Sequence, residues 1–129
     1  MPLDDGLYAI KLAESDYYLS LSDEGELIAQ KGDTQGFTLQ SEGDAFTILS
    51  PSGPLGAKDH VVAAAEQPIL WTITKAEIPD GWVIGEQGNS SGWWLNPEES
   101  DKVAFRTLIA FPTEPPRYPP PEIFVFEKR

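Results

Sequence analysis

The chain has 129 residues, with 21 acidic and 9 basic side chains, so its formal charge is −12, and 40% of its residues are hydrophobic. This length and composition indicate one folded domain, and the charge argues against nucleic acid or an anionic membrane as partner, because few cations are available to pair with phosphate. The sequence has no cysteine, no apolar run of membrane-spanning length and no signal peptide at its N-terminus, so it predicts a cytoplasmic protein without disulfides, metal sites or cofactors.

Three strand-like triplets, each of the form aromatic-x-Ile, recur along the chain. They begin at Tyr8, Phe46 and Trp82, and their starts differ by 38 residues (46 − 8) and 36 residues (82 − 46). Each triplet is followed by two short apolar runs that flank a polar turn, which is the pattern of a β-hairpin. The sequence therefore predicts three hairpins, over residues 17–30, 54–64 and 93–106.

Each of these three passes ends in a second kind of triplet, aromatic-x-apolar, which begins at Phe37, Trp71 and Phe124. Side chains alternate along a strand, so we expect the outer residues of both kinds of triplet to face the core and the middle residues to face away. Four strands repeated three times, without a helical period, predict an all-β protein with the β-trefoil fold. One domain, residues 1–129, would contain three four-stranded repeats with pseudo-three-fold symmetry, at about 6–43, 44–79 and 80–129.

The third repeat is longer than the second. Phe124 follows Trp71 by 53 residues (124 − 71), whereas Trp71 follows Phe37 by only 34 (71 − 37). The excess is the run 111–122, in which six of twelve residues are proline. Proline is excluded from helix interiors and central strands, so we predict a stiff, extended loop before the last strand. A lengthened loop on a regular scaffold usually serves function.

Several segments resemble the mushroom β-trefoil serine protease inhibitors, the cospin-like family called mycospins. The resemblance covers the first strand and the third repeat, in the segments LDDGLYAI at 3–10, GW at 92–93, PEE at 97–99, LI at 108–109 and PPRYPPPEIF at 115–124. It implies a β-trefoil without catalytic activity that inhibits trypsin-like proteases through an exposed loop, in a defensive or regulatory role. The resemblance implies that members do not all use the same loop: one reactive site in the family is the loop between the second and third strands, and the loop before the last strand is another candidate.

The loop before the last strand offers Arg117 to a protease. An arginine can pair with the carboxylate at the base of a trypsin-like specificity pocket, and prolines on both sides would hold the chain extended. The predicted protease-binding loop consists of Pro115, Pro116, Arg117, Tyr118 and Pro119, with Arg117 as the specificity residue. The alternative is that the prolines only brace one end of the barrel while Arg117 is solvated.

Two other loops are weaker candidates. Their residues are Asp23, Glu24, Gly25 and Lys58. The loop 22–26 contains no lysine or arginine, so it suits a trypsin-like pocket poorly, and the aspartate after Lys58 makes a poor cleavage site. We expect Lys58 and Lys102 to be solvated turn residues.

Three other classes of function compete with inhibition. An enzyme is not expected, because the one histidine, His60, has no nucleophile motif beside it. A lectin is the main rival: Trp93 and Trp94 are consecutive, so only one can face the core, and the other is a candidate sugar platform. A non-catalytic partner subunit is the third. The expected partners are a trypsin-like serine protease or, alternatively, glycans, and we expect a monomer because a closed barrel leaves no long free edge.

Overall fold

A computed structural model describes residues 3–31, 35–58, 60–65, 69–77, 80–88, 90–108 and 119–129. In these ranges the chain forms short antiparallel strands and one 3-10 helix, η1 (Pro120–Glu122), so the prediction of an all-β protein is confirmed. The strands are β1 (Gly6–Leu12), β2 (Tyr17–Leu21), β3 (Leu27–Lys31), β4 (Phe37–Glu42), β5 (Ala45–Ser50), β6 (Gly53–Lys58), β7 (Val61–Ala64), β8 (Trp71–Glu77), β9 (Asp80–Glu86), β10 (Ser91–Trp94), β11 (Ala104–Thr107) and β12 (Ile123–Lys128). No helix in the described ranges is long and apolar enough to cross a membrane.

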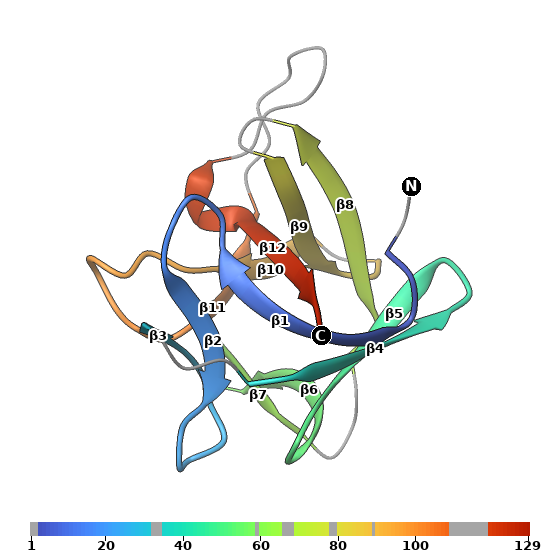
Figure 1. The fold of residues 1–129 in the computed structure, drawn as a ribbon, viewed down its shortest axis with the longest axis horizontal. Coiled ribbons are helices and arrows are strands. Elements are labelled where there is room, and N and C mark those ends of the chain that lie inside the picture. Colours follow the sequence, from blue (N-terminus) through green and yellow to red (C-terminus); the bar gives the residue numbers. More distant parts are fainter. Residues whose placement is uncertain are drawn as a thin grey trace.

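Six of the strands pair in a closed ring. β1 pairs with β12 and β4, β4 with β5, β5 with β8, β8 with β9, and β9 with β12. A wider ring of nine strands closes as well, because β6, β7, β11 and β10 connect β5 to β9 by a second route. Figure 1 shows β1 lying between β12 and β4, with the C-terminus close to the start of β1. Closure pairs the backbone groups that an open sheet would leave at its edges.

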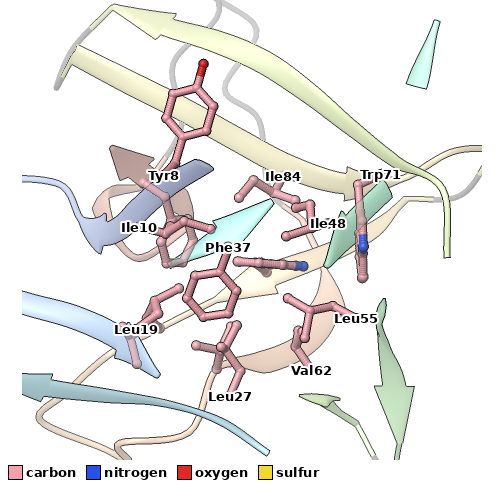
Figure 2. Packing of buried hydrophobic residues seen from close by; sticks show 14 of the residues in the cluster. Tyr8, Ile10, Leu19, Leu27, Phe37, Ile48, Leu55, Val62, Trp71 and Ile84 are labelled. Atoms are coloured by element: carbon pink, nitrogen blue, oxygen red, sulfur yellow. The ribbon is translucent and has the colours of Figure 1, made fainter. Parts of the chain in front are cut away.

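The core fills the interior of this closed sheet and draws on all three predicted passes. Figure 2 shows side chains from β1, β2, β3, β4, β5, β6, β7, β8 and β9 converging on one cluster. The triplet residues that are buried there, each at most 8% exposed, are Tyr8, Ile10, Phe37, Leu39, Phe46, Ile48, Trp71, Ile84 and Phe124. Most of the triplets therefore supply the core as the alternation predicts.

The alternation fails where β9 and β12 pair. Trp82 is only half-buried, and its ring lies beneath the Lys75 ammonium at 5.2 Å, so the expectation that it faces the core is wrong. The middle residue Val83 is instead buried in a second cluster with Ala13 and Ile123. The turn after β1 covers the outer face of this sheet region, since Ala13 N donates to Ile123 O at 3.0 Å. Both faces of β9 are thus partly covered by other residues, so alternation along this strand no longer separates buried from exposed side chains.

Candidate functional site

The predicted protease-binding loop lies almost wholly outside the described residues. The residues that fall there are Pro115, Pro116, Arg117 and Tyr118. Pro119 is described, with an extended backbone at φ −62° and ψ 145°. The two ends of the connection are also described, at Leu108 and from Pro119 onwards, and they show how the scaffold holds it.

The entry to the loop is fixed beside the start of β10. Leu108 N donates to Ser90 O at 2.8 Å, and the Leu108 side chain packs against the second apolar cluster. Gly92 makes this close approach possible. A Cβ atom at residue 92 would lie 2.6 Å from Leu108 Cδ1 and 2.8 Å from Gly85 Cα, and closer still to Ile84 O. Any side chain there would push β9, β10 and the loop entry apart.

The exit from the loop is fixed beside the end of β10. Leu95 N donates to Pro121 O at 2.9 Å, and Glu122 N donates to Pro119 O at 3.0 Å within η1. Ile123 then begins β12 fully buried. Because Ser90 directly precedes β10 and Leu95 directly follows it, both roots of the loop are hydrogen-bonded at the two ends of one strand. We call this arrangement the β10 clamp.

Glu122 stands at the exit root with a carboxylate that is 0% exposed. Burying a carboxylate is costly unless polar or charged partners compensate, so such a residue normally has a specific structural role. In the sequence it is merely the residue that ends the proline-rich run. Its burial depends on η1 folding back over β9 and β10, which no local pattern indicates.

The loop between β2 and β3 has a different construction. Ser22 N donates to Glu26 O at 2.8 Å, and Gly25 N donates to Ser22 O at 2.9 Å. The Ser22 hydroxyl oxygen also accepts from the amides of Glu24 and Glu26, at 3.3 and 3.2 Å. Gly25 takes the left-handed conformation, φ 82°, that this tight turn requires. The loop is therefore closed by its own backbone, and it presents the exposed carboxylates of Asp23 and Glu24.

The basic residues of the other turns differ from one another. Lys58 is exposed at the end of β6, and the prediction that it is solvated agrees with this position. Lys102 is exposed outside the strands too, as predicted, and its ammonium also lies 2.9 Å from Glu26 Oε1. The hydrogen bond to Glu26 raises the pKa of Lys102 above its ordinary value. This ion pair joins the β10–β11 connection to the β2–β3 hairpin.

Backbone hydrogen bonds join the three hairpins in a closed triangle. Ala64 N donates to Gly25 O at 2.8 Å, which links β6–β7 to β2–β3. Val62 N donates to Val103 O and Val103 N donates to Leu27 O, both at 2.9 Å, which link the third hairpin to the other two. Each hairpin is thus held by both neighbours, and their turns have little freedom to move separately.

The two consecutive tryptophans have opposite positions. Trp93 is 0% exposed and packs edge-to-face against Trp71 and Phe124, with ring centroids 5.6 and 5.7 Å away. It is therefore a core residue, and the prediction of Trp93 as a sugar platform is wrong. Trp94 is half-buried on the outer face, with the Arg106 guanidinium carbon 4.3 Å from its ring centroid. Only Trp94 remains a candidate platform.

The described ranges contain no group of three or more His, Asp or Glu side chains placed to hold a metal ion. His60 is exposed in the β6–β7 turn, at φ 66°, and its carbonyl oxygen accepts from Phe105 N at 2.8 Å. This residue therefore has an evident structural role in joining β7 to β11.

Comparison with known proteins identifies the class. A family model described as Peptidase inhibitor I66 matches residues 1–128, so the chain belongs to this family of peptidase inhibitors. The structure is similar to that of a proteinase inhibitor from Coprinopsis cinerea, with a TM-score of 0.86 and 18% sequence identity over 99% of this chain and 100% of that one. At this level of identity the likeness shows a shared fold. No curated protein matches the chain. The prediction of a protease inhibitor is confirmed, and membership of the family points to a non-catalytic protein.

Proposed function

We propose that this protein inhibits a trypsin-like serine protease by presenting the Arg117–Tyr118 peptide bond as a substrate. The observation that carries the proposal is the β10 clamp, in which the Leu108 amide donates a hydrogen bond to the Ser90 carbonyl and the Leu95 amide donates one to the Pro121 carbonyl. A loop that enters a protease cleft must lose little entropy on binding. Fixed roots and the proline-rich sequence both lower that entropic cost.

The fold in this proposal is a β-trefoil. It is supported by the ring of six strands, β1, β4, β5, β8, β9 and β12, and by the three hairpins β2–β3, β6–β7 and β10–β11. The triangle of hydrogen bonds among the hairpins closes one end of such a barrel. The three repeats would then be the strand sets β1–β4, β5–β8 and β9–β12, with the reactive loop in the third.

The chemistry of the loop suits a trypsin-like pocket. The guanidinium of Arg117 would form a charge-assisted and bidentate pair with the pocket carboxylate. Tyr118 leaves the target peptide bond without a proline on its carboxyl side, while Pro116 and Pro119 flank the pair. The chain charge of −12 favours a basic protease and predicts an association rate that falls with salt. The proposal includes a cytoplasmic location, which fractionation of producing cells would test.

The β2–β3 loop is the alternative reactive segment, and its geometry does not favour it against trypsin. Ser22, Gly25 and Glu26 close the turn on itself, so no extended segment protrudes for a protease to bind. Its outward side chains, Asp23 and Glu24, would meet the pocket carboxylate with like charge.

The direct test is a panel of Arg117 variants assayed against trypsin, with chymotrypsin, subtilisin and a papain-like protease alongside. Truncating one partner of a buried, hydrogen-bonded charge pair costs about 2–5 kcal/mol, so Arg117→Ala should weaken trypsin inhibition at least about 30-fold. Arg117→Lys keeps the charge and should retain most of the inhibition. Lys58→Ala, at an exposed position on another hairpin, is the matched control and should leave inhibition unchanged.

The two ways in which this proposal can fail are distinguishable. If Arg117→Ala inhibits trypsin as well as the unmodified protein does, Arg117 is not the specificity residue and the loop is a brace. If the unmodified protein inhibits only the papain-like enzyme, the assignment to serine proteases is wrong while membership of the inhibitor family stands.

A further inference from the structure

The outer face of the β10–β11 hairpin carries an isolated pair, Arg106 stacked on Trp94. Arg106 pairs in register with Gly92, and Trp94 pairs with Ala104, so these four residues share one face of the hairpin. Gly92 has no side chain and Ala104 only a methyl group, so nothing separates the two large groups. They meet on the diagonal, with the guanidinium carbon 4.3 Å from the ring centroid.

This stacking prepares the arginine for a planar anion. A guanidinium lying over an aromatic ring is restricted to one plane, and it loses less freedom when it forms two parallel hydrogen bonds. Arg106 is exposed, so the donors of its fork can be reached from solvent. A carboxylate matches the fork in geometry and charge.

Arg106 lines two hollows of the surface, and Trp94 lines one of them. The larger, of ≈ 600 Å³, is lined by His60, Ser91, Ala104, Phe105, Arg106 and Thr107. The smaller, of ≈ 200 Å³, shares Ala104 and Arg106 and adds Trp94, Asn96, Glu99 and Lys102. Arg106 therefore lines both hollows and can contact a ligand that occupies both.

The charges in the two hollows indicate how a ligand would lie. Glu99 would repel an anionic group in the smaller hollow, and Lys102 there is already paired with Glu26 at 2.9 Å. The larger hollow is lined by His60, Ser91 and Thr107, and no carboxylate lines it among the described residues. A carboxylate would thus bind on the His60 side of Arg106, and neutral hydroxyl groups would bind beside Asn96 and Glu99.

We propose that the Trp94–Arg106 face binds a short acidic oligosaccharide, with the carboxylate of a uronic acid on Arg106 and the adjoining sugar in the smaller hollow. An extended peptide fits less well, because a peptide would have to add to the outer edge of β11. Part of that edge is taken, since Phe105 N donates to His60 O and Ala104 pairs with Val61. A sugar needs polar partners such as hydroxyl and amide groups instead, and Ser91, Thr107 and Asn96 line the two hollows. This site uses none of the residues of the protease-binding loop.

The test is a calorimetric titration of the full chain with an aldobiouronic acid, a disaccharide of one uronic acid and one neutral sugar, combined with amide chemical-shift mapping. Three variants are compared: Arg106→Ala, Arg106→Lys and Lys75→Ala. Lys75 also lies over a tryptophan, Trp82, at 5.2 Å, so Lys75→Ala removes an equivalent cation–aromatic pair elsewhere. The methyl ester of the same disaccharide is the control ligand, because it keeps the sugar rings and loses the charge.

The acid should bind the unmodified protein and Lys75→Ala equally and shift the amides of Gly92, Ala104 and Thr107. Arg106→Ala should weaken binding about tenfold or more, and Arg106→Lys should weaken it by a smaller factor, since it keeps the charge without the planar fork. Trypsin inhibition by Arg106→Ala should be unchanged, which separates this site from the protease-binding loop.

Any of four results would overturn the proposal. These are no binding of the acid, equal binding of the methyl ester, undiminished binding by Arg106→Ala, or tighter binding of a tetraglutamate peptide. The last result would instead define the face as a site for an acidic protein segment.

Discussion

The loop between β2 and β3 and the connection between β11 and β12 are held in place by different means. The first is closed by its own backbone and by the Ser22 hydroxyl. The second is held from outside, because its roots bond to Ser90 and Leu95 at the two ends of β10. A loop that closes on itself keeps its shape without help from the rest of the fold, but its backbone groups are hydrogen-bonded within the turn and few remain to bind a partner. A loop clamped at its roots can present its middle, at the cost of depending on the strand that clamps it.

The largest effect is expected from Gly92→Ala, which breaks the β10 clamp at its centre. The new methyl group would meet Gly85 Cα at 2.8 Å and Leu108 Cδ1 at 2.6 Å, and backbone at such distances must move. Overpacking of a closed site typically costs 1–3 kcal/mol, and because the backbone of β9 must shift as well as the Leu108 side chain, we expect about 3 kcal/mol of lost unfolding free energy. Urea denaturation measures this loss.

Gly36→Ala is the matched control for Gly92→Ala. The nearest atom to its new Cβ would be Leu7 Cδ1 at 3.0 Å, the end of a side chain that is 45% exposed and free to shift. Its stability should stay within about 0.5 kcal/mol of the unmodified protein. Equal stability of the Gly92 and Gly36 variants would show that β10 is not packed tightly against the entry root.

An intermediate effect is expected from Ser22→Ala, which tests whether the β2–β3 loop closes itself. The substitution removes the oxygen that accepts from the amides of Glu24 and Glu26. Hydrogen bonds of this kind contribute about 1 kcal/mol to stability, and less where water replaces the partner. We expect a loss of about 1 kcal/mol in the same denaturation experiment and no change in trypsin inhibition. Ser52→Ala, at an exposed position, is the control. A loss of inhibition by Ser22→Ala alone would mean that this loop, too, contacts the protease.

The sequence predicts the strands of this protein better than it predicts how they are joined. Apolar alternation and polar turns locate strand segments such as Tyr17–Leu21 and Leu27–Lys31, because each depends on local pattern and on burial of one face. Trp82 does not follow the alternation of core-facing and outward-facing residues, because its outward position depends on Ala13 and Ile123 covering the opposite face of β9. The hydrogen bonds of the β10 clamp leave no mark in the sequence, because the Ser90 carbonyl and the Leu95 N–H are backbone groups that every residue except proline has.

The candidate site shows the same limit. The proline-rich run and Arg117 are visible in the sequence as composition, whereas the stacking of Arg106 on Trp94 depends on strand register. A signal was present in the small residues Gly92 and Ala104, each two positions from a large partner. It becomes readable only when β10 and β11 are known to pair in that register, which the nine-residue connection 95–103 leaves open.

The smallest effect is expected from Lys102→Met, which removes the ion pair between the β10–β11 connection and the β2–β3 hairpin. The Lys102 ammonium lies 2.9 Å from Glu26 Oε1. The hydrogen bond to Glu26 and then its charge raise the pKa of Lys102 above the ordinary value of 10.5. The folded state therefore holds this proton more tightly than the unfolded state, so the stabilisation is fully present below pH 10.5 and is lost as the pH rises through the folded pKa.

Lys102→Met should be less stable than the unmodified protein at pH 7, by less than Ser22→Ala, and the difference should shrink towards pH 11 and in high salt. Lys58→Met, at an exposed position in β6, should show no such dependence. A Lys102→Met deficit that persists unchanged at pH 11 would assign the stabilisation to packing of the lysine stem, and the hairpin triangle would then be held by its backbone bonds alone.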